Sequence, residues 1–479
     1  MVHCAGSVKG FVRMNGFYTD RFVRQRLIEF LGGETLESAT AVYVTHSDGC
    51  RFDRRELHAP ADLDWFFERD LDIARSLADT KSHLLHLDLE YVNFDSPGEV
   101  FVDPWRCFEL QEPVVKVIEA LLLEWGIRPL HIITGQGHHF VWRIARTSKV
   151  AQEIQNLGLS PELTDLCMER LPPPLVGGIV AADQTFFAAL ALVIEFVAHR
   201  IKEQAATRCA LPVEITAVSV GPHLTQQREM ISIDISEYGD PLHTRMIRLP
   251  FTNYRKPWVT GLAKWLGIED QIATFRAIPL HEMDFRQAIK MRQEEQEVLE
   301  LARRACVRIP RQEAGTHRLL ECYRASRLRS LHEFFYSIPH GSRECWVEAY
   351  GGTSLDALPP CARHLVVFPN DLLLKPAGLQ MLTRCLLAQN WHPRHIAGLI
   401  RSKFEDPAYG WGNDWSDYEA ATRADFYTRL FAFLHMVGID RLVDFNCTSN
   451  REKGFCFPPQ DGTCNLEPLR RTLLTRLDT

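Results

Sequence analysis

Residues 83–91 read HLLHLDLEY, an alternation of polar and apolar side chains that is typical of a half-buried β-strand. Successive side chains of a strand point to opposite faces, so Asp88 and Glu90 share one face, while Leu85 and Leu87 make the other face apolar. Two neighbouring carboxylates repel one another unless a cation lies between them. The strand therefore predicts a divalent-cation site, with acids placed for solubility as the alternative.

A glycine-containing turn follows at residues 134–139, which read TGQGHH. It separates two short apolar segments, and this pattern predicts a β-hairpin. Gly135 and Gly137 permit positive φ angles and close approach of a ligand, so the turn can offer backbone amides to a triphosphate while an imidazole adds a donor. His138 and His139 both fit that role, and a plain hairpin with a surface histidine is the alternative.

A third acid, Asp234, ends the apolar strand pattern ISID at residues 231–234. The cationic segment RMIRLPFTNYRK follows shortly at 245–256 and contains Arg248 and Lys256. An arginine suits triphosphate oxygens through its planar fork, and a lysine does so as a point charge. Asp183 is a weaker rival to Asp234, since it fits the N-cap of the following helix.

Alternating helical and strand patterns predict a mixed α/β domain in the first part of the chain. Helices are expected at 21–31, 62–77, 112–125 and 186–201, and strands at 40–45, 83–91, 130–134, 139–144, 213–220, 230–235 and 246–249. Beyond about residue 286 the pattern becomes charged and helical, and strand signals become scarce. We predict an α/β domain at 1–285, a charged helical linker at 286–350 and an α-helical domain at 351–479.

Composition indicates a soluble folded protein of 479 residues, 46% of them hydrophobic and 24% charged. No apolar run approaches the roughly 20 residues that span a bilayer, and the start lacks a secretory pattern, so we expect a cytoplasmic protein that does not use a membrane. The 13 cysteines are then expected to be free thiols or metal ligands. A net charge of −7 argues against a generally nucleic-acid-coated surface, although the arginine-rich stretch 303–329 fits a phosphate-backbone path or a solvated helix face about equally.

In their order and spacing, these elements resemble the motifs of the archaeo-eukaryotic primase superfamily, over about residues 35–260. Those motifs are a strand with two acids, a small-residue turn leading to a histidine, and a later apolar-Asp strand followed by cationic residues. The resemblance implies an α/β (α+β) primase-polymerase catalytic core with an RRM-like sheet. It makes Asp88, Glu90 and Asp234 the catalytic ligands of Mg²⁺ or Mn²⁺, and it assigns nucleotide binding to Thr134, His139, Arg248 and Lys256.

Four cysteines form a second candidate site near the C-terminus: Cys361, Cys447, Cys456 and Cys464. The last three lie in a stretch rich in Gly, Pro and Asn, where a metal would supply stabilisation that a hydrophobic core cannot. Four thiolates suit a [4Fe–4S] cluster or Zn²⁺, and scattered free cysteines are the alternative. Residues 355–465 resemble the iron–sulfur domain of the primase large subunit, which opens on Pro-Pro-Cys and is α-helical. Cys385 fits a helical core position instead.

The two resemblances together imply one polypeptide that joins a polymerising module to one that helps hold the initiating nucleotide and template. The expected activity is de novo primer synthesis on single-stranded DNA from NTPs or dNTPs, in service of a replicative helicase, a mobile element or a defence system. A metal-dependent nuclease or rolling-circle replication initiator is the second hypothesis, although it calls for a His-x-His motif near a tyrosine. A non-catalytic single-strand-binding accessory protein is the third.

Overall fold

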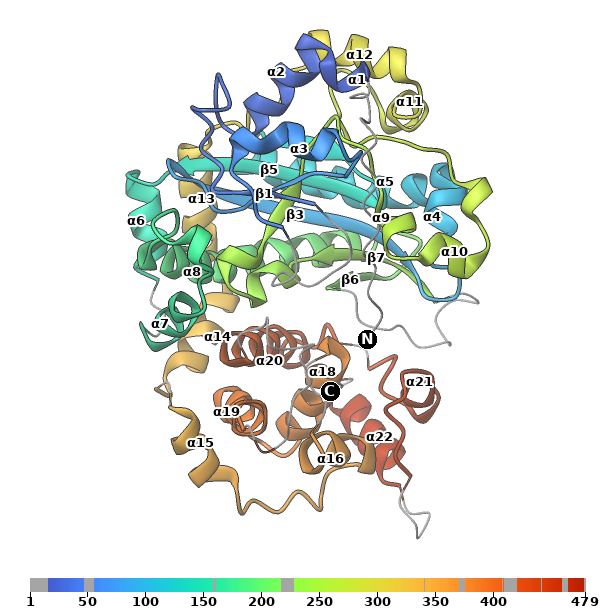
Figure 1. Ribbon diagram of the computed structural model, residues 1–479. Coiled ribbons are helices and arrows are strands. Elements are labelled where there is room, and N and C mark those ends of the chain that lie inside the picture. The colour runs from blue at the N-terminus through green and yellow to red at the C-terminus, as the bar shows by residue number, and fades with distance from the viewer. Residues whose placement is uncertain are drawn as a thin grey trace.

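The computed structural model describes residues 16–46, 56–157, 161–216, 228–339, 341–369, 375–406, 408, 420–440, 442–458 and 464–477. Figure 1 shows an upper part that contains both β-sheets and a lower part made of helices. The protein is therefore an α+β protein, as the sequence predicts at the level of fold class.

The larger sheet has six strands in the order β6-β7-β3-β5-β4-β9, with the predicted acid-bearing strand, β3, near its centre. Neighbouring strands are antiparallel except β6 and β7, which are parallel. The predicted hairpin is present, since β4 and β5 pair with Ile133 opposite His138. The strands are β3 (Ser82–Asn93), β4 (Leu130–Ile133), β5 (Gly137–Ala145), β6 (Val213–Ile215), β7 (Glu229–Asp234) and β9 (Ile278–Pro279).

Two long helices, α5 (Pro104–Glu124) and α8 (Ala181–Ala205), pack on the sheet. His83 of β3 stacks on Phe186 of α8 with ring centroids 3.7 Å apart, so odd-numbered side chains of β3 face the helices. By length and composition α8 passes the test for a membrane span, but 78% of its apolar window is buried, as in a core helix. Shorter helices surround the sheets: α1 (Gly16–Thr19), α2 (Arg21–Phe30), α4 (Glu99–Val102), α6 (Lys149–Gln155), α7 (Pro161–Glu169), α9 (Lys256–Val259) and α10 (Leu262–Leu266).

The second sheet shows that the helix expected at residues 62–77 is wrong. Residues 62–77, expected as one helix, form the short helix α3 (Leu63–Phe67), a turn and a strand. Asp70 in that turn has a φ of 49°, which lies outside the helical region. The sheet consists of β1 (Val44–Thr45), β2 (Ala74–Ser76) and β8 (Met246–Arg248), in the order β1-β2-β8. Pairing with strands distant in sequence overrides the local helical pattern of β2.

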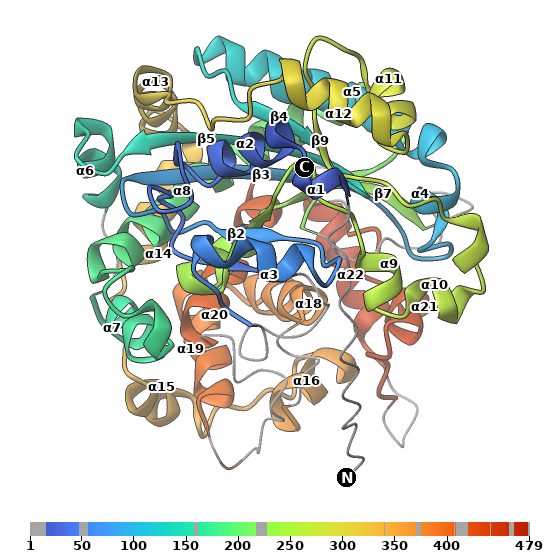
Figure 2. The same ribbon diagram turned by 45° about the horizontal axis from the view of Figure 1, so that its top comes forward.

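The segment at 286–350 is helical and packs against the α/β part. Its helices are α11 (Phe285–Met291), α12 (Glu295–Arg304), α13 (Glu313–Arg324), α14 (Arg327–Tyr336) and α15 (Arg343–Tyr350). Trp142 Nε1 donates to Thr316 Oγ1 at 3.1 Å, and the backbone N–H of Arg143 donates to the carbonyl of Pro310 at 2.9 Å. Figure 2 shows α12 beside α2, and α11 contacts α5. The first half of this segment therefore belongs to the packed α/β part.

Most arginines of the 303–329 stretch form ion pairs or backbone contacts. Arg303 pairs with Glu300, Arg308 with Glu34, Arg311 with Glu313, Arg324 with Glu153 and Glu321, and Arg329 with Glu333. Arg318 donates Nε–H to the carbonyl of Trp125 at 2.8 Å. Because acids neutralise these cations, the structure favours a solvated helix face over a phosphate-backbone path.

The helical C-terminal part docks on the α/β part through a buried polar network. It consists of α16 (Pro360–Val367), α18 (Pro376–Leu387), α19 (Pro393–Phe404), α20 (Ala420–Met436), α21 (Cys447–Glu452) and α22 (Leu466–Leu477). Glu195 of α8 accepts hydrogen bonds from Arg429 of α20, and it lies 3.0 Å from Nε2 of His332 on α14. Burial alone would raise the pKa of Glu195, but Arg429 and His332 lower it to about 2. One carboxylate therefore joins three helices.

Replacing Glu195 by Gln is expected to lower the free energy of unfolding by about 3–5 kcal/mol, because Arg429 would be left as a buried charge without a counterion. Urea unfolding measures the change. The control is Glu203→Gln in α8, which breaks an exposed pair with Arg200 and should cost about 1 kcal/mol or less. Equal costs for the two variants would show that the buried network does not hold the parts together.

Candidate functional site

Three neighbouring strands bring the predicted acids and a histidine into one row. Asp88 of β3 lies opposite Asp234 of β7 on one side and opposite His139 of β5 on the other. Directly opposed residues of antiparallel strands project from the same face. His139 Nε2 lies 3.4 Å from Asp88 Oδ1. Glu90 projects from the same face two residues further along β3.

The register separates the two candidate histidines. His138 lies opposite Leu89, so it projects to the helix-covered face, where its ring contacts Phe108 of α5. Its Nδ1 lies 2.8 Å from Nε2 of His131. His139 alone of the two therefore faces the acids. Burial, followed by the nearby His86, holds the pKa of His139 well below its usual range, which makes it a neutral imidazole.

Two of the acids, Asp88 and Glu90, have raised pKa values. Burial raises the pKa of Asp88 to about 7, and Asp234 adds to the rise while His86 opposes it. Burial also raises the pKa of Glu90 to about 7, against the opposing charge of Lys256. Oδ1 of Asp88 is buried and makes no hydrogen bond within the described residues. Partly buried carboxylates in this state fit a divalent cation, which supplies the missing charge and the missing ligand bond.

Cationic side chains stand beside this row. Nζ of Lys256 donates to Oε1 of Gln136 in the glycine turn at 2.5 Å. Burial would lower the pKa of Lys256, but Tyr254 and Glu90 raise it, so the ammonium stays charged. Arg248 is bound to the Asp72 carboxylate and lies over the Tyr254 ring, 4.4 Å from its centroid. Both predicted cations are thus near the acids, although Arg248 already has an anionic partner.

Thr134 shapes the turn through its hydroxyl and its backbone N–H. Its hydroxyl donates to the carbonyl of Gly137 at 3.2 Å, and its backbone N–H donates to the same carbonyl at 2.9 Å. A Cβ at Gly137 would collide with the backbone carbonyl of Leu89 on β3. The turn therefore needs glycine at 137 for close strand approach.

Sequence reasoning missed His86 and Glu237. His86 precedes Asp88 by two residues on the same strand face, and its Nδ1 lies 2.9 Å from Oε1 of Glu237. Its ring meets that of His139 edge to face, with centroids 4.7 Å apart. The alternation of residues 83–91 could have predicted that His86 lies on the same strand face as Asp88 and Glu90. Glu237 follows β7 in a short 3₁₀ turn, and nothing in its local pattern marks it.

The four C-terminal cysteines are near enough to affect the pKa values of one another's thiols, although no three of their sulfur atoms lie within 4.8 Å of one another. Burial raises the pKa of the Cys361 thiol to about 12, and the neighbouring thiols of Cys464 and Cys447 add to the rise. Burial and then Cys464 raise the pKa of Cys447, and Cys456 contributes further. Asn450 Nδ2 lies 3.8 Å from Cys361 Sγ. Cys385 is fully buried in α18, as predicted for a core position.

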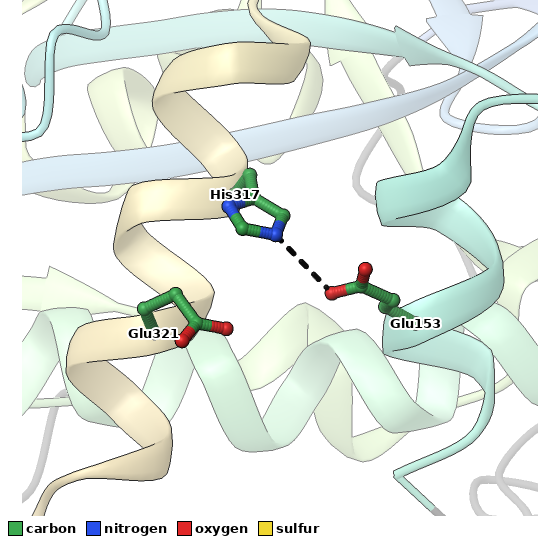
Figure 3. Close-up of side chains that lie close together, drawn as sticks. All are labelled: Glu153, His317 and Glu321. Atoms are coloured by element: carbon green, nitrogen blue, oxygen red, sulfur yellow. Dashed lines mark ion pairs between the residues drawn. The ribbon is translucent and has the colours of Figure 1, made fainter.

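A different group of residues has potential metal-ligand atoms close together. Glu153 of α6, with His317 and Glu321 of α13, places three ligand atoms within 4.8 Å of one another, and Figure 3 shows these side chains pointing toward a common space. His317 Nε2 lies 3.5 Å from Glu153, but Arg324 pairs with both glutamates, at 3.1 and 2.7 Å. Lys149 also lies 3.6 Å from Glu153. An ion-pair network that docks α13 on α6 accounts for the group.

Neither predicted metal site is as tight as that group. Within the described residues, no other set of three His, Cys, Asp or Glu ligand atoms lies within 4.8 Å. A tetrahedral zinc site holds its thiolates about 3.8 Å apart, whereas the thiolates of an iron–sulfur cluster bind different iron atoms and stand further apart. Two catalytic cations, about 3.5–4 Å apart, likewise spread their ligands. A cluster or a cation pair therefore does not require three ligand atoms within 4.8 Å of one another.

Comparison with known proteins gives no match for this chain: no family model, no curated protein and no solved structure is similar to it.

Proposed function

We propose that the chain is a metal-dependent nucleotidyltransferase of the archaeo-eukaryotic primase type, a primase-polymerase that synthesises primers de novo on single-stranded DNA. The row of Asp88, Asp234 and His139 across three strands carries the proposal. A largely antiparallel sheet with β3 near its centre and two helices on one face supports an RRM-like catalytic core. Asp88 and Glu90 are partly buried and their pKa values are raised, which supports a functional site over surface acids placed for solubility.

Asp88, Glu90 and Asp234 would hold the divalent cations, Mg²⁺ or Mn²⁺. Such ions activate the attacking hydroxyl and neutralise charge that develops on the α-phosphate and the pyrophosphate. The neutral His139 can donate one N–H to a phosphate oxygen, since its Nδ1 makes no hydrogen bond within the described residues. Lys256 offers an ammonium at the glycine turn, on the side where a triphosphate would lie.

The cysteine group supports a second role for the C-terminal part. Cys361, Cys447, Cys456 and Cys464 would hold a [4Fe–4S] cluster, with Zn²⁺ as the alternative occupant. De novo initiation requires two nucleotides and a template base to be positioned together. Joining both modules in one chain raises the effective concentration of these parts.

The nuclease or rolling-circle alternative receives less support. It requires two histidines on one strand face, but His138 and His139 project to opposite faces of β5. The accessory-protein alternative predicts single-strand binding without metal-dependent synthesis, so the same experiment tests it.

The experiment is incubation of the protein with single-stranded DNA, Mg²⁺ or Mn²⁺, and nucleotides labelled on the γ-phosphate, without primer. Products that retain the γ-label at their 5′ end are expected, because the initiating nucleotide keeps its triphosphate. Extension of an added primer alone would reduce the proposal to a polymerase. DNA binding with neither synthesis nor cleavage would favour the accessory protein, and cleavage would favour the nuclease.

A further inference from the structure

Arg292, at the C-terminal end of α11, is a buried cation that has no anionic partner among the described residues. Three arginines of the described chain have less than 2% of their surface exposed: Arg75, Arg292 and Arg394. Arg75 pairs with Asp79 and Arg394 with Asp425, whereas no carboxylate among the described residues pairs with Arg292. A buried charge that lacks a counterion destabilises a folded protein, so this arrangement requires another explanation.

The contacts of Arg292 lead to the glycine turn of the candidate active site. Its Nη1 donates to the backbone carbonyl of Thr134 at 2.5 Å. The guanidinium lies over the rings of Phe275 and Phe108, 4.3 and 5.2 Å from their centroids. Phe275 stacks in turn on Tyr254, whose hydroxyl lies 3.3 Å from Oε1 of Gln136. The cation is therefore packed against the turn, whose Gln136 also contacts Lys256.

This contact sets the orientation of a backbone donor. In a trans peptide the C=O and the following N–H point in opposite directions. Because Arg292 binds the carbonyl of Thr134, the N–H of Gly135 points away from Arg292. That N–H has no hydrogen-bond partner among the described residues, and neither has the N–H of Gln136. Two free N–H groups in a glycine turn, with a positive charge behind them, are the arrangement that binds phosphate oxygens.

Building on the proposed function, we propose that Arg292 is a positioning residue for the triphosphate of the incoming nucleotide: it orients the 134–137 turn, and the bound polyanion supplies its missing counterion. In the nucleotide-free protein the buried charge of Arg292 destabilises the fold. In the nucleotide complex the negative charge of the triphosphate compensates it.

The neighbouring Arg276 provides a matched control. It is also buried, with 6% of its surface exposed, and its backbone N–H donates to the carbonyl of Arg292 at 3.0 Å. Unlike Arg292, it pairs with a carboxylate, that of Glu295 at 2.9 Å. Its role is therefore structural, and its replacement should leave nucleotide binding unchanged.

The test measures nucleotide kinetics and thermal unfolding of the full-length chain carrying R292M, R292K or R276M. R292M should raise the KM for nucleotides about tenfold and leave kcat within about twofold, without lowering the unfolding temperature of the nucleotide-free protein. R292K should give an intermediate KM, because it keeps the charge but loses the planar fork. R276M should lower the unfolding temperature and leave KM unchanged.

An unchanged KM in R292M overturns the inference. So does an R292M chain that is destabilised or fails to fold, because either result would show a structural role. Equilibrium binding of a fluorescent nucleoside triphosphate to the wild-type and R292M chains with Mg²⁺ distinguishes a failure of the proposed function from a failure of the role of Arg292. A wild-type chain that binds no nucleotide refutes the proposed function and this inference with it, whereas binding that R292M retains in full refutes the role of Arg292 alone.

Discussion

Asp88→Asn is expected to reduce metal-dependent nucleotide incorporation by about 10³-fold, while the chain stays folded. Asn keeps the shape of the side chain but removes one of the charges that would hold divalent cations. Asp88 lies in the centre of the row, opposite both Asp234 and His139, so no neighbouring carboxylate can take its place. Primer-free and primer-extension assays should both show the loss, since both need the same cations.

The same substitution should stabilise the metal-free protein. Burial raises the pKa of Asp88 from 3.8 to about 7, so the folded chain retains a proton that the unfolded chain releases above about pH 4. The stability of the metal-free wild type therefore falls as the pH rises from about 4 to about 7. Asn cannot ionise, so at pH 8 the variant should gain up to about 4 kcal/mol, because each unit of pKa shift corresponds to about 1.4 kcal/mol, and the gain should shrink as the pH falls toward 4. Thermal unfolding in EDTA measures this difference.

Added Mg²⁺ or Mn²⁺ should reverse the order of stability, because the cations bind the folded wild type and stabilise it by mass action. Asp270→Asn is the control, since Asp270 is exposed in the short 3₁₀ helix after α10 and lies outside the row. It should change neither activity nor the response to cations. Wild-type incorporation by Asp88→Asn would remove Asp88 from the catalytic site.

Cys447→Ser is expected to remove the C-terminal metal group and, with it, de novo initiation. The purified wild type should contain about one cluster per chain, measured as iron and sulfide, and the variant close to none. Primer-free synthesis should fall by about 10²-fold or more, because the second module would no longer hold the initiating nucleotide. Primer extension should persist, since the acids lie on strands β3 and β7 of the six-stranded sheet, outside the helical C-terminal part that carries the cysteines.

Cys345→Ser is the matched control, because Cys345 is an exposed free cysteine outside the group of four. It should retain both metal and initiation. One equivalent of zinc without iron would assign the alternative occupant. A fully folded wild type without any metal, made under anaerobic conditions, would contradict the site. Parallel loss of initiation and extension in Cys447→Ser would show that the two parts do not act separately.

Local patterns in the sequence were sufficient for the central strand and the hairpin. The alternation at 83–91 predicts β3 and places Asp88 and Glu90 on one face, because that property depends only on the period of an extended chain. The glycines at 135 and 137 predict the turn for a similarly local reason. The same reasoning failed for residues 62–77, where pairing with β1 and β8 creates a strand that the local pattern does not contain.

By itself, then, the sequence determined the acid-bearing strand, the glycine turn and the overall α+β class, because period and turn chemistry are encoded within a few consecutive residues. Only the tertiary structure decided that Asp234 and His139 stand opposite Asp88, and that His138 does not, because strand register joins residues far apart in the chain. It also placed Arg292, from a segment that reads as a charged linker, against the turn. Arg292 is buried without a counterion because it packs against Phe108 and Phe275, and these residues are too far away in the sequence for a local pattern to predict the contact.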